Sequence, residues 1–191
     1  MPTVLDVEKQ RFTFGNAWKI AFKYDDTNFY RGGPEKLKGK IDGHAQSTRA
    51  VDVIALHDEA GLLLLEAKDF RGHRIANKKR ITDSEIIIEA AIKARDTLAG
   101  LIGAARTNNH QFDAVTIWKA MGKNNRLVIV LWLEDDASKD ALRWKQQLDT
   151  LTQLLKTKLG WLEAKCFVLG NATKNRLADL IVTDLPGAGK L

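Results

Sequence analysis

Two acidic residues and a lysine interrupt a pair of apolar runs, and their spacing suits the binding of a cation. Asp52 lies near the start of the run 51–56, and Glu66 and Lys68 end the run 62–68. A charge in an apolar setting loses much of its solvation unless it is paired or bound to a metal. These residues therefore predict a site at which two carboxylates hold one cation beside an ammonium group.

The geometry of a β-hairpin sharpens this prediction. Residues along a strand alternate faces, and the segment 57–61 is polar enough to form the turn. If the hairpin is centred on Glu59, Asp52 lies opposite Glu66, with Cβ atoms roughly 5 Å apart. Lys68 then lies on the same face, roughly 6–7 Å further along the strand. A slip of one residue would turn one strand to its other face, so the prediction depends on the register.

At these residues the sequence resembles the PD-(D/E)xK phosphodiesterases, which are restriction-endonuclease-like nucleases. The matching residues are Asp52 and the tripeptide Glu66-Ala67-Lys68, whereas Val51 stands where the family pattern has proline. The resemblance implies a Mg²⁺ ion, for which Mn²⁺ can substitute, held by Asp52, Glu66 and the carbonyl of Ala67. It also implies that Lys68 orients the attacking water and stabilises charge on the phosphate.

Members of the family often use one more acid, from the first helix or the loop after it. The candidates are Glu8, Asp25, Asp26 and Glu35. Asp25 is preferred as a metal ligand because it precedes the sheet, although Asp25 and Asp26 also suit a turn in which they bond only to local backbone.

Basic residues follow Lys68 closely, and they have two interpretations. They are Arg71, Arg74, Lys78, Lys79 and Arg80. They can grip nucleic-acid phosphates next to the site, or they can form a solvated loop that balances the nearby acids. Three further basic residues, Lys93, Arg95 and Arg106, are expected to be surface charges on a long helix.

Hydrophobic periodicity predicts an α/β fold in which helices flank a mixed central β-sheet. The expected elements are a helix at 12–24, a strand at 36–45, the hairpin strands, a helix at 84–106, a strand at 126–133, a helix at 141–158 and a strand at 162–169. Thr82 and Glu85 predict a capping box for the long helix, and 71–80 is expected to be irregular. The α-β-β-β-α-β order, plus a further helix and strand, matches the restriction-endonuclease-like core that the resemblance implies.

The composition is that of an ordinary globular protein. The chain has 191 residues, of which 45% are hydrophobic and 28% charged, so one domain over 1–185 with a flexible tail at 186–191 is expected.

The sequence has no signal-peptide pattern and no apolar run of the ~20 residues that span a bilayer, so no membrane partner is expected. The single cysteine, Cys166, is expected to be a packing residue and suits the cytoplasm.

These observations together predict a Mg²⁺-dependent endonuclease that acts on DNA in repair, restriction or defence, with RNA also open as a substrate. The net charge of +6 favours a polyanionic partner. A homodimer is compatible with this function, because two symmetric sites can cut both strands of a duplex. The alternatives are a non-catalytic nucleic-acid-binding module of the same fold, or a scaffold that docks on a partner protein through the helix at 141–158.

Overall fold

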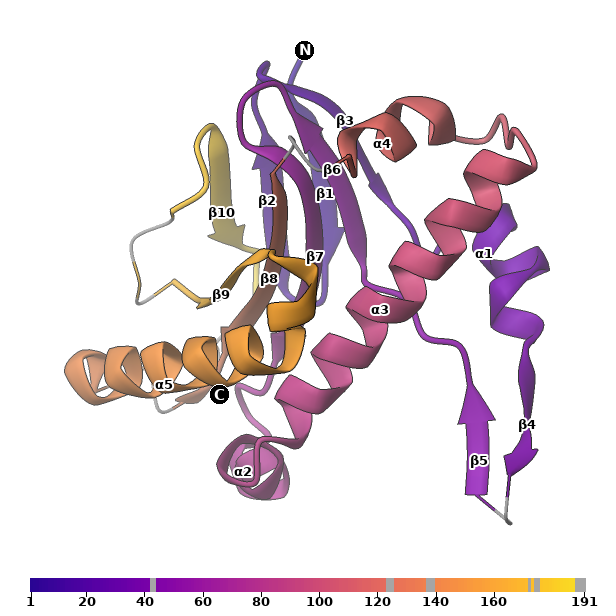
Figure 1. Cartoon of the computed structure of the whole chain (residues 1–191). Coiled ribbons are helices and arrows are strands. Elements are labelled where there is room, and N and C mark those ends of the chain that lie inside the picture. The colour runs from indigo at the N-terminus through magenta and orange to yellow at the C-terminus, as the bar shows by residue number, and fades with distance from the viewer. Residues whose placement is uncertain (42–43, 123–125, 137–139, 172, 174–175, 188–191) are drawn as a thin grey trace.

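The chain folds into three layers, with a mixed five-stranded sheet in the middle (Figure 1). The structure is a computed structural model, and it describes residues 1–41, 44–122, 126–136, 140–171, 173 and 176–187. Helices cover one face of the sheet and a three-stranded sheet covers the other. The predicted α/β class and the mixed sheet flanked by helices are therefore confirmed.

The five strands follow the order β3-β6-β7-β8-β9. Their bounds are β3 Trp18–Lys23, β6 Val53–His57, β7 Gly61–Asp69, β8 Leu127–Glu134 and β9 Lys165–Leu169. The strands β3, β6 and β7 are antiparallel, whereas β7, β8 and β9 are parallel. Parallel neighbours need long crossovers, and helices fill them.

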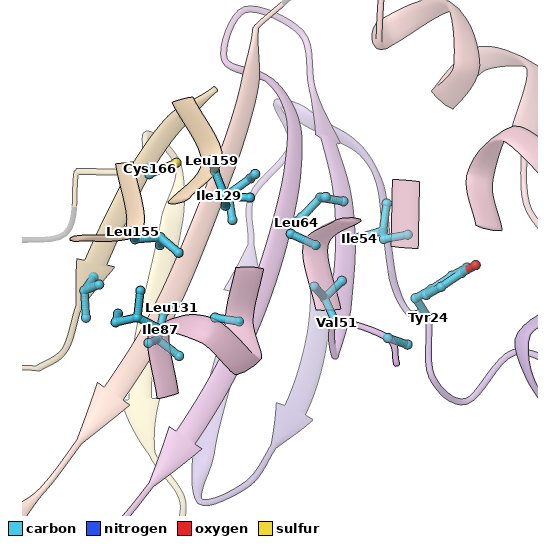
Figure 2. Close-up of a cluster of buried hydrophobic side chains, with 14 of the residues drawn as sticks. Tyr24, Val51, Ile54, Leu64, Ile87, Ile129, Leu131, Leu155, Leu159 and Cys166 are labelled. Carbon is cyan, nitrogen blue, oxygen red and sulfur yellow. The ribbon is translucent and has the colours of Figure 1, made fainter. Parts of the chain in front are cut away.

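In the described part of these two crossovers lie four α-helices. Their bounds are α2 Arg74–Thr82, α3 Glu85–Arg106, α4 Ala114–Ala120 and α5 Ala141–Leu159, and the short 3₁₀ turn η3 Gly160–Leu162 follows α5. Apolar side chains of α3 and α5 form one core with the sheet, and Figure 2 shows Ile87, Leu131 and Leu155 within it. Cys166 is buried in the same core, as expected, and burial raises the pKa of its thiol to about 11.

The opposite face of the sheet packs against three antiparallel strands in the order β1-β2-β10. They are β1 Thr3–Val7, β2 Gln10–Phe14 and β10 Leu180–Asp184. The ring of Phe12 meets the ring of Trp132 edge to face at 5.7 Å. The strands β6, β7 and β8 are therefore covered on both faces, which explains their continuous apolar sequences.

The hairpin register agrees with the prediction. His57 pairs with Gly61 and Val53 pairs with Leu65, so the turn is centred on Glu59. The ring of His57 closes this turn, because its Nδ1 accepts hydrogen bonds from the backbone N–H groups of Glu59 and Ala60, both at 3.0 Å.

The expected helix at 12–24 is wrong, because this segment forms β2 and β3. The two strands are separated by a turn at Gly15, whose backbone N–H donates to the carbonyl of Asp179. Phe12, Phe14 and Trp18 are buried at even spacing. In a short apolar stretch the same residues fit both a helical and an extended pattern, and the pairing of β2 with β10 and of β3 with β6 decides for strands.

The expected strand at 36–45 is placed differently. The segment contains β4, Lys38–Ile41, and the start of β5, His44–Ser47, and these two strands pair in a separate ribbon. The edge position beside β6 belongs to β3 instead. The ribbon follows the short helix α1, Asn28–Gly32, and the 3₁₀ turn η1, Pro34–Lys36.

Three predictions around the long helices differ in detail. The segment 71–80, expected to be irregular, contains most of α2. The capping box is absent, because Thr82 is the last residue of α2 and Ser84, at φ 60°, begins α3 without a side-chain hydrogen bond. The sequence patterns do not predict α4 and β10, since each is short and neither has a strong period of its own.

The other long elements are confirmed within a few residues: the helices at 84–106 and 141–158 and the strand at 126–133. The last predicted strand, 162–169, begins at Lys165, after η3.

Most of the predicted tail, 188–191, lies outside the described residues. Among the described helices, none is both long enough and apolar enough to cross a membrane.

A buried polar cluster joins the two sheets at the carboxyl ends of β7 and β8. Asp69 accepts a hydrogen bond from the Gln10 amide at 3.1 Å and forms an ion pair with Arg71 at 2.6 Å. Arg71 also pairs with Asp184 of β10 at 2.9 Å. These contacts tie β2 and β10 to the end of β7.

Glu134 lies near this cluster, at the end of β8. Its Oε1 accepts hydrogen bonds from Trp132 Nε1 at 3.0 Å and from the backbone N–H of Asn171 at 2.7 Å. Burial raises the pKa of Glu134 to about 7, although both hydrogen bonds and the charge of Arg71 favour the ionised form. The folded state therefore holds a proton that an unfolded chain releases at lower pH.

We expect Glu134→Gln to change how stability depends on pH. The folded pKa of Glu134 lies above its ordinary value, so Glu134 favours folding at low pH and loses this contribution as pH rises towards the folded pKa. The glutamine oxygen can keep both hydrogen bonds and does not ionise. The free energy of unfolding of the variant, measured relative to that of the parent, should rise by about 2 kcal/mol from about pH 5 to about pH 7. Urea unfolding at both pH values measures this difference, and parallel stability profiles would contradict it.

Candidate active site

The hairpin brings Asp52 beside the tripeptide Glu66-Ala67-Lys68, as the register predicts. Asp52 Oδ2 accepts a hydrogen bond from the backbone N–H of Ala67 at 2.7 Å. The backbone carbonyl of Asp52 accepts one from the N–H of Tyr24 at 2.9 Å. Asp52 thus lies just beyond the last described pair of β6 and β7, with its carboxylate held by β7 and its backbone held by the residue that follows β3.

Glu66 is the most buried charged residue of the site, with 3% of its side chain exposed. Its Oε1 lies 2.6 Å from Lys93 Nζ and 2.9 Å from Lys68 Nζ. Burial and the negative charge of Asp52 nevertheless raise the pKa of Glu66 to about 7. Burial is the larger cause, because it disfavours the ionised carboxylate more than the two lysines stabilise it.

Lys68 extends towards three carboxylates. Besides Glu66, its Nζ lies 3.9 Å from both Glu8 and Glu89. Burial disfavours the charged amine, but the neighbouring carboxylates outweigh it, and the pKa of Lys68 lies above its ordinary value. Lys68 therefore presents a positively charged group in this site at neutral pH.

The helix α3 adds two residues that sequence reasoning does not place in the site. The expectation that Lys93 is a surface charge is wrong, because its side chain is 15% exposed and pairs with Glu66. Glu89, one turn earlier, pairs with Arg80 at 2.6 Å. Both residues border the buried stripe of α3 that includes Ala90. A glutamate and a lysine four residues apart, beside an apolar stripe, are the sequence signal that could have located them.

Asp25 lies within electrostatic reach of Asp52. Burial, followed by the charges of Asp52 and Asp26, raises the pKa of Asp25 above its ordinary value. The other candidate acids each lie near a basic residue. Asp26 pairs with Lys23 and Arg31, Glu35 pairs with Lys38, and Glu8 lies near Lys68.

Two buried oxygens in this region, Glu66 Oε2 and Asp25 Oδ1, have no hydrogen-bond partner among the residues that the structure describes. Buried polar atoms normally have a partner, so these oxygens indicate that a further group belongs here. A hard divalent cation is a suitable group, because carboxylate and carbonyl oxygens are its preferred ligands.

The carboxylates do not form a complete cage. Within the described ranges, no three His, Cys, Asp or Glu side chains converge closely enough to hold a metal ion unaided. Mg²⁺ commonly binds through one or two carboxylates and keeps several waters, whereas structural Zn²⁺ needs four protein ligands. The residues present therefore fit Mg²⁺ with help from a carbonyl, water or substrate oxygen.

The five basic residues predicted to bind nucleic acid have different environments. Arg71 is 12% exposed, and its guanidinium is occupied by Asp69 and Asp184. Arg80 pairs with Glu89. Lys78 is exposed, and Lys79 has 81% of its side chain exposed. The side chain of Arg74 lies outside the described part of the structure. Lys78 and Lys79 thus remain available for a phosphate, whereas Arg71 joins two strands.

No family model matches this chain, and neither a curated protein nor a solved structure shows significant similarity to it. The resemblance to nucleases therefore depends on the site residues and on the order of the elements.

Proposed function

We propose that this protein is a Mg²⁺-dependent nuclease of the PD-(D/E)xK type, and that it hydrolyses phosphodiester bonds in DNA. The observation that carries this proposal is the meeting of Asp52, Glu66 and Lys68 at the open end of one hairpin. Two acids and a lysine in this order and register are the residues that the chemistry needs.

The arrangement of the elements supports the proposal. Three antiparallel strands, β3, β6 and β7, are followed by α3 and by β8, which is parallel to β7. This order matches three strands, a helix and a fourth strand of the nuclease core. One difference is that the described residues before β3 form β1 and β2 rather than the opening helix of that core.

The proposed roles follow from the contacts. Asp52 and Glu66 would hold the ion, with the carbonyl of Ala67 and with Asp25 as further ligands. When bound, the ion would neutralise charge on the phosphate and lower the pKa of its water. Lys68 would place an ammonium group beside the attacking water and the phosphate. Lys93 pairs with Glu66 Oε1, which leaves Oε2 free to face the ion.

A metal-dependent cleavage screen tests this proposal. Labelled duplex, single-stranded and branched DNA, and RNA, would be incubated with Mg²⁺, with Mn²⁺ or with chelator. We expect cleavage of DNA with either metal and none with chelator. Asp52→Asn keeps the size of the side chain but removes its charge, and it should lose cleavage while circular dichroism remains unchanged.

Two outcomes would contradict the proposal. A mobility shift without cleavage of any substrate would indicate a binding module, and cleavage by Asp52→Asn at the parental rate would place the chemistry elsewhere.

A further inference from the structure

The ribbon of β4 and β5 stands apart from both sheets (Figure 1). In the described part of the chain, these two strands pair only with each other. Its base is held by two hydrogen bonds at Thr48: the Thr48 N–H donates to the carbonyl of Leu37 at 3.3 Å, and the Tyr30 hydroxyl donates to the carbonyl of Thr48 at 3.0 Å.

Such a ribbon gains little from burial. An isolated two-stranded hairpin is only marginally stable in water. Leu37, at the base, has 76% of its surface exposed, and Lys38 to Lys40 are exposed throughout. We therefore expect a short ribbon of this kind to pack against the surface of another molecule.

The charge of the ribbon indicates what that surface is. From Lys36 to Arg49 the sequence has four basic residues and one acidic residue, Asp42. Lys38 and Lys40 flank Gly39 and therefore lie on one face of β4. The pair of Lys38 with Glu35, at 3.6 Å between exposed groups, contributes little and leaves this lysine able to exchange partners.

The base of the ribbon borders the candidate active site. An open hollow of about 370 Å³ is lined by Asp25 and Lys93 together with Glu35, Thr48 and Arg49. A polyanion bound at the acidic site can therefore run past Arg49 and reach the lysines of the ribbon.

We propose that the β4–β5 ribbon is a DNA-binding arm that lies in the major groove of a double helix. The major groove admits a two-stranded ribbon, whereas a single strand offers no groove of this shape. Lys38 and Lys40 on β4, and Lys36 at the end of η1 just before the ribbon, contact the phosphates that border the groove. This inference deepens the proposed function, on which it rests for the cleavage step, because it names duplex DNA as the substrate class.

The test compares two triple variants that remove the same charge. Lys36, Lys38 and Lys40 are changed to alanine in the arm variant, and Lys145, Lys156 and Lys158, all exposed on α5, are changed to alanine in the control. Binding of a labelled duplex and of a single strand of equal length is measured with chelator present, over a series of salt concentrations. Urea unfolding of each variant checks that it is folded.

We expect the arm variant to lose at least about tenfold in duplex affinity. The slope of log affinity against log salt should fall by about 2.7, or about 0.9 for each phosphate that the arm no longer neutralises. Its binding of the single strand should change much less, and the α5 control should resemble the parent for both ligands.

The inference is overturned if the arm variant binds duplex as the parent does, or no more weakly than the α5 control. It is also overturned if the arm variant only dissociates a dimer of the parent, since this would assign the ribbon to a protein contact. Failure of the proposed function is distinguishable, because the parent would then bind duplex through the arm yet cleave no substrate with Mg²⁺ or Mn²⁺.

Discussion

Changing Lys68 to alanine is expected to reduce the cleavage rate at least about 100-fold, the usual cost of removing a group that stabilises charge in a transition state. Lys68 is held by Glu66 at 2.9 Å and keeps its positive charge at neutral pH. Its contribution should appear mainly in the transition state, so kcat should fall while KM changes little. Single-turnover cleavage of labelled DNA measures the loss.

The matched control for this substitution is Lys156→Ala. Lys156 is an exposed lysine on α5, so its removal changes the net charge equally without touching the site. This variant should cleave like the parent. Equal losses in both variants would show that only general charge matters, and parental cleavage by Lys68→Ala would remove Lys68 from the mechanism.

Changing Gly61 to alanine is expected to destabilise the fold by about 3 kcal/mol or more. Gly61 has φ +85°, which is strained for a residue with a Cβ by roughly 1–2 kcal/mol. A Cβ there would lie 2.0 Å from the backbone oxygen of Arg126, so strands must also move apart, at a further cost of about 1–3 kcal/mol.

This change also tests the dependence of the site on the hairpin register. Gly61 pairs with His57, so a shift there displaces Asp52 relative to Glu66 and should lower cleavage as well as stability. Urea unfolding measures the stability. Gly160→Ala is the control, because Gly160 has φ −56° and nothing within 4 Å of its would-be Cβ. If Gly61→Ala were as stable as Gly160→Ala, the close approach to Arg126 would be unimportant.

The sequence predicts best where the deciding interactions are local. The turn at 57–61 sets the pairing of β6 with β7 over a few residues, so counting from Glu59 suffices to place Asp52 beside Glu66. Long elements with a strong period, α3, β8 and α5, are also predictable, because many residues contribute to each pattern.

Prediction fails where distant segments decide the outcome. The residues of 12–24 fit two patterns, and they are strands because β2 pairs with β10, which lies near the other end of the chain. Pairing over such separations leaves no local signal. The same reason explains Arg71, whose partner Asp184 also lies far along the sequence.

The identity and register of Asp52, Glu66 and Lys68 are thus set by the amino-acid sequence itself, through the period of two and one short turn. Their electrostatic setting is decided only by the tertiary structure. Packing of α3 on the sheet places Lys93 against Glu66, and the fold brings Asp25 within electrostatic reach of Asp52. Charge interactions act through space, so they depend on which elements meet, and no local pattern in the chain records that meeting.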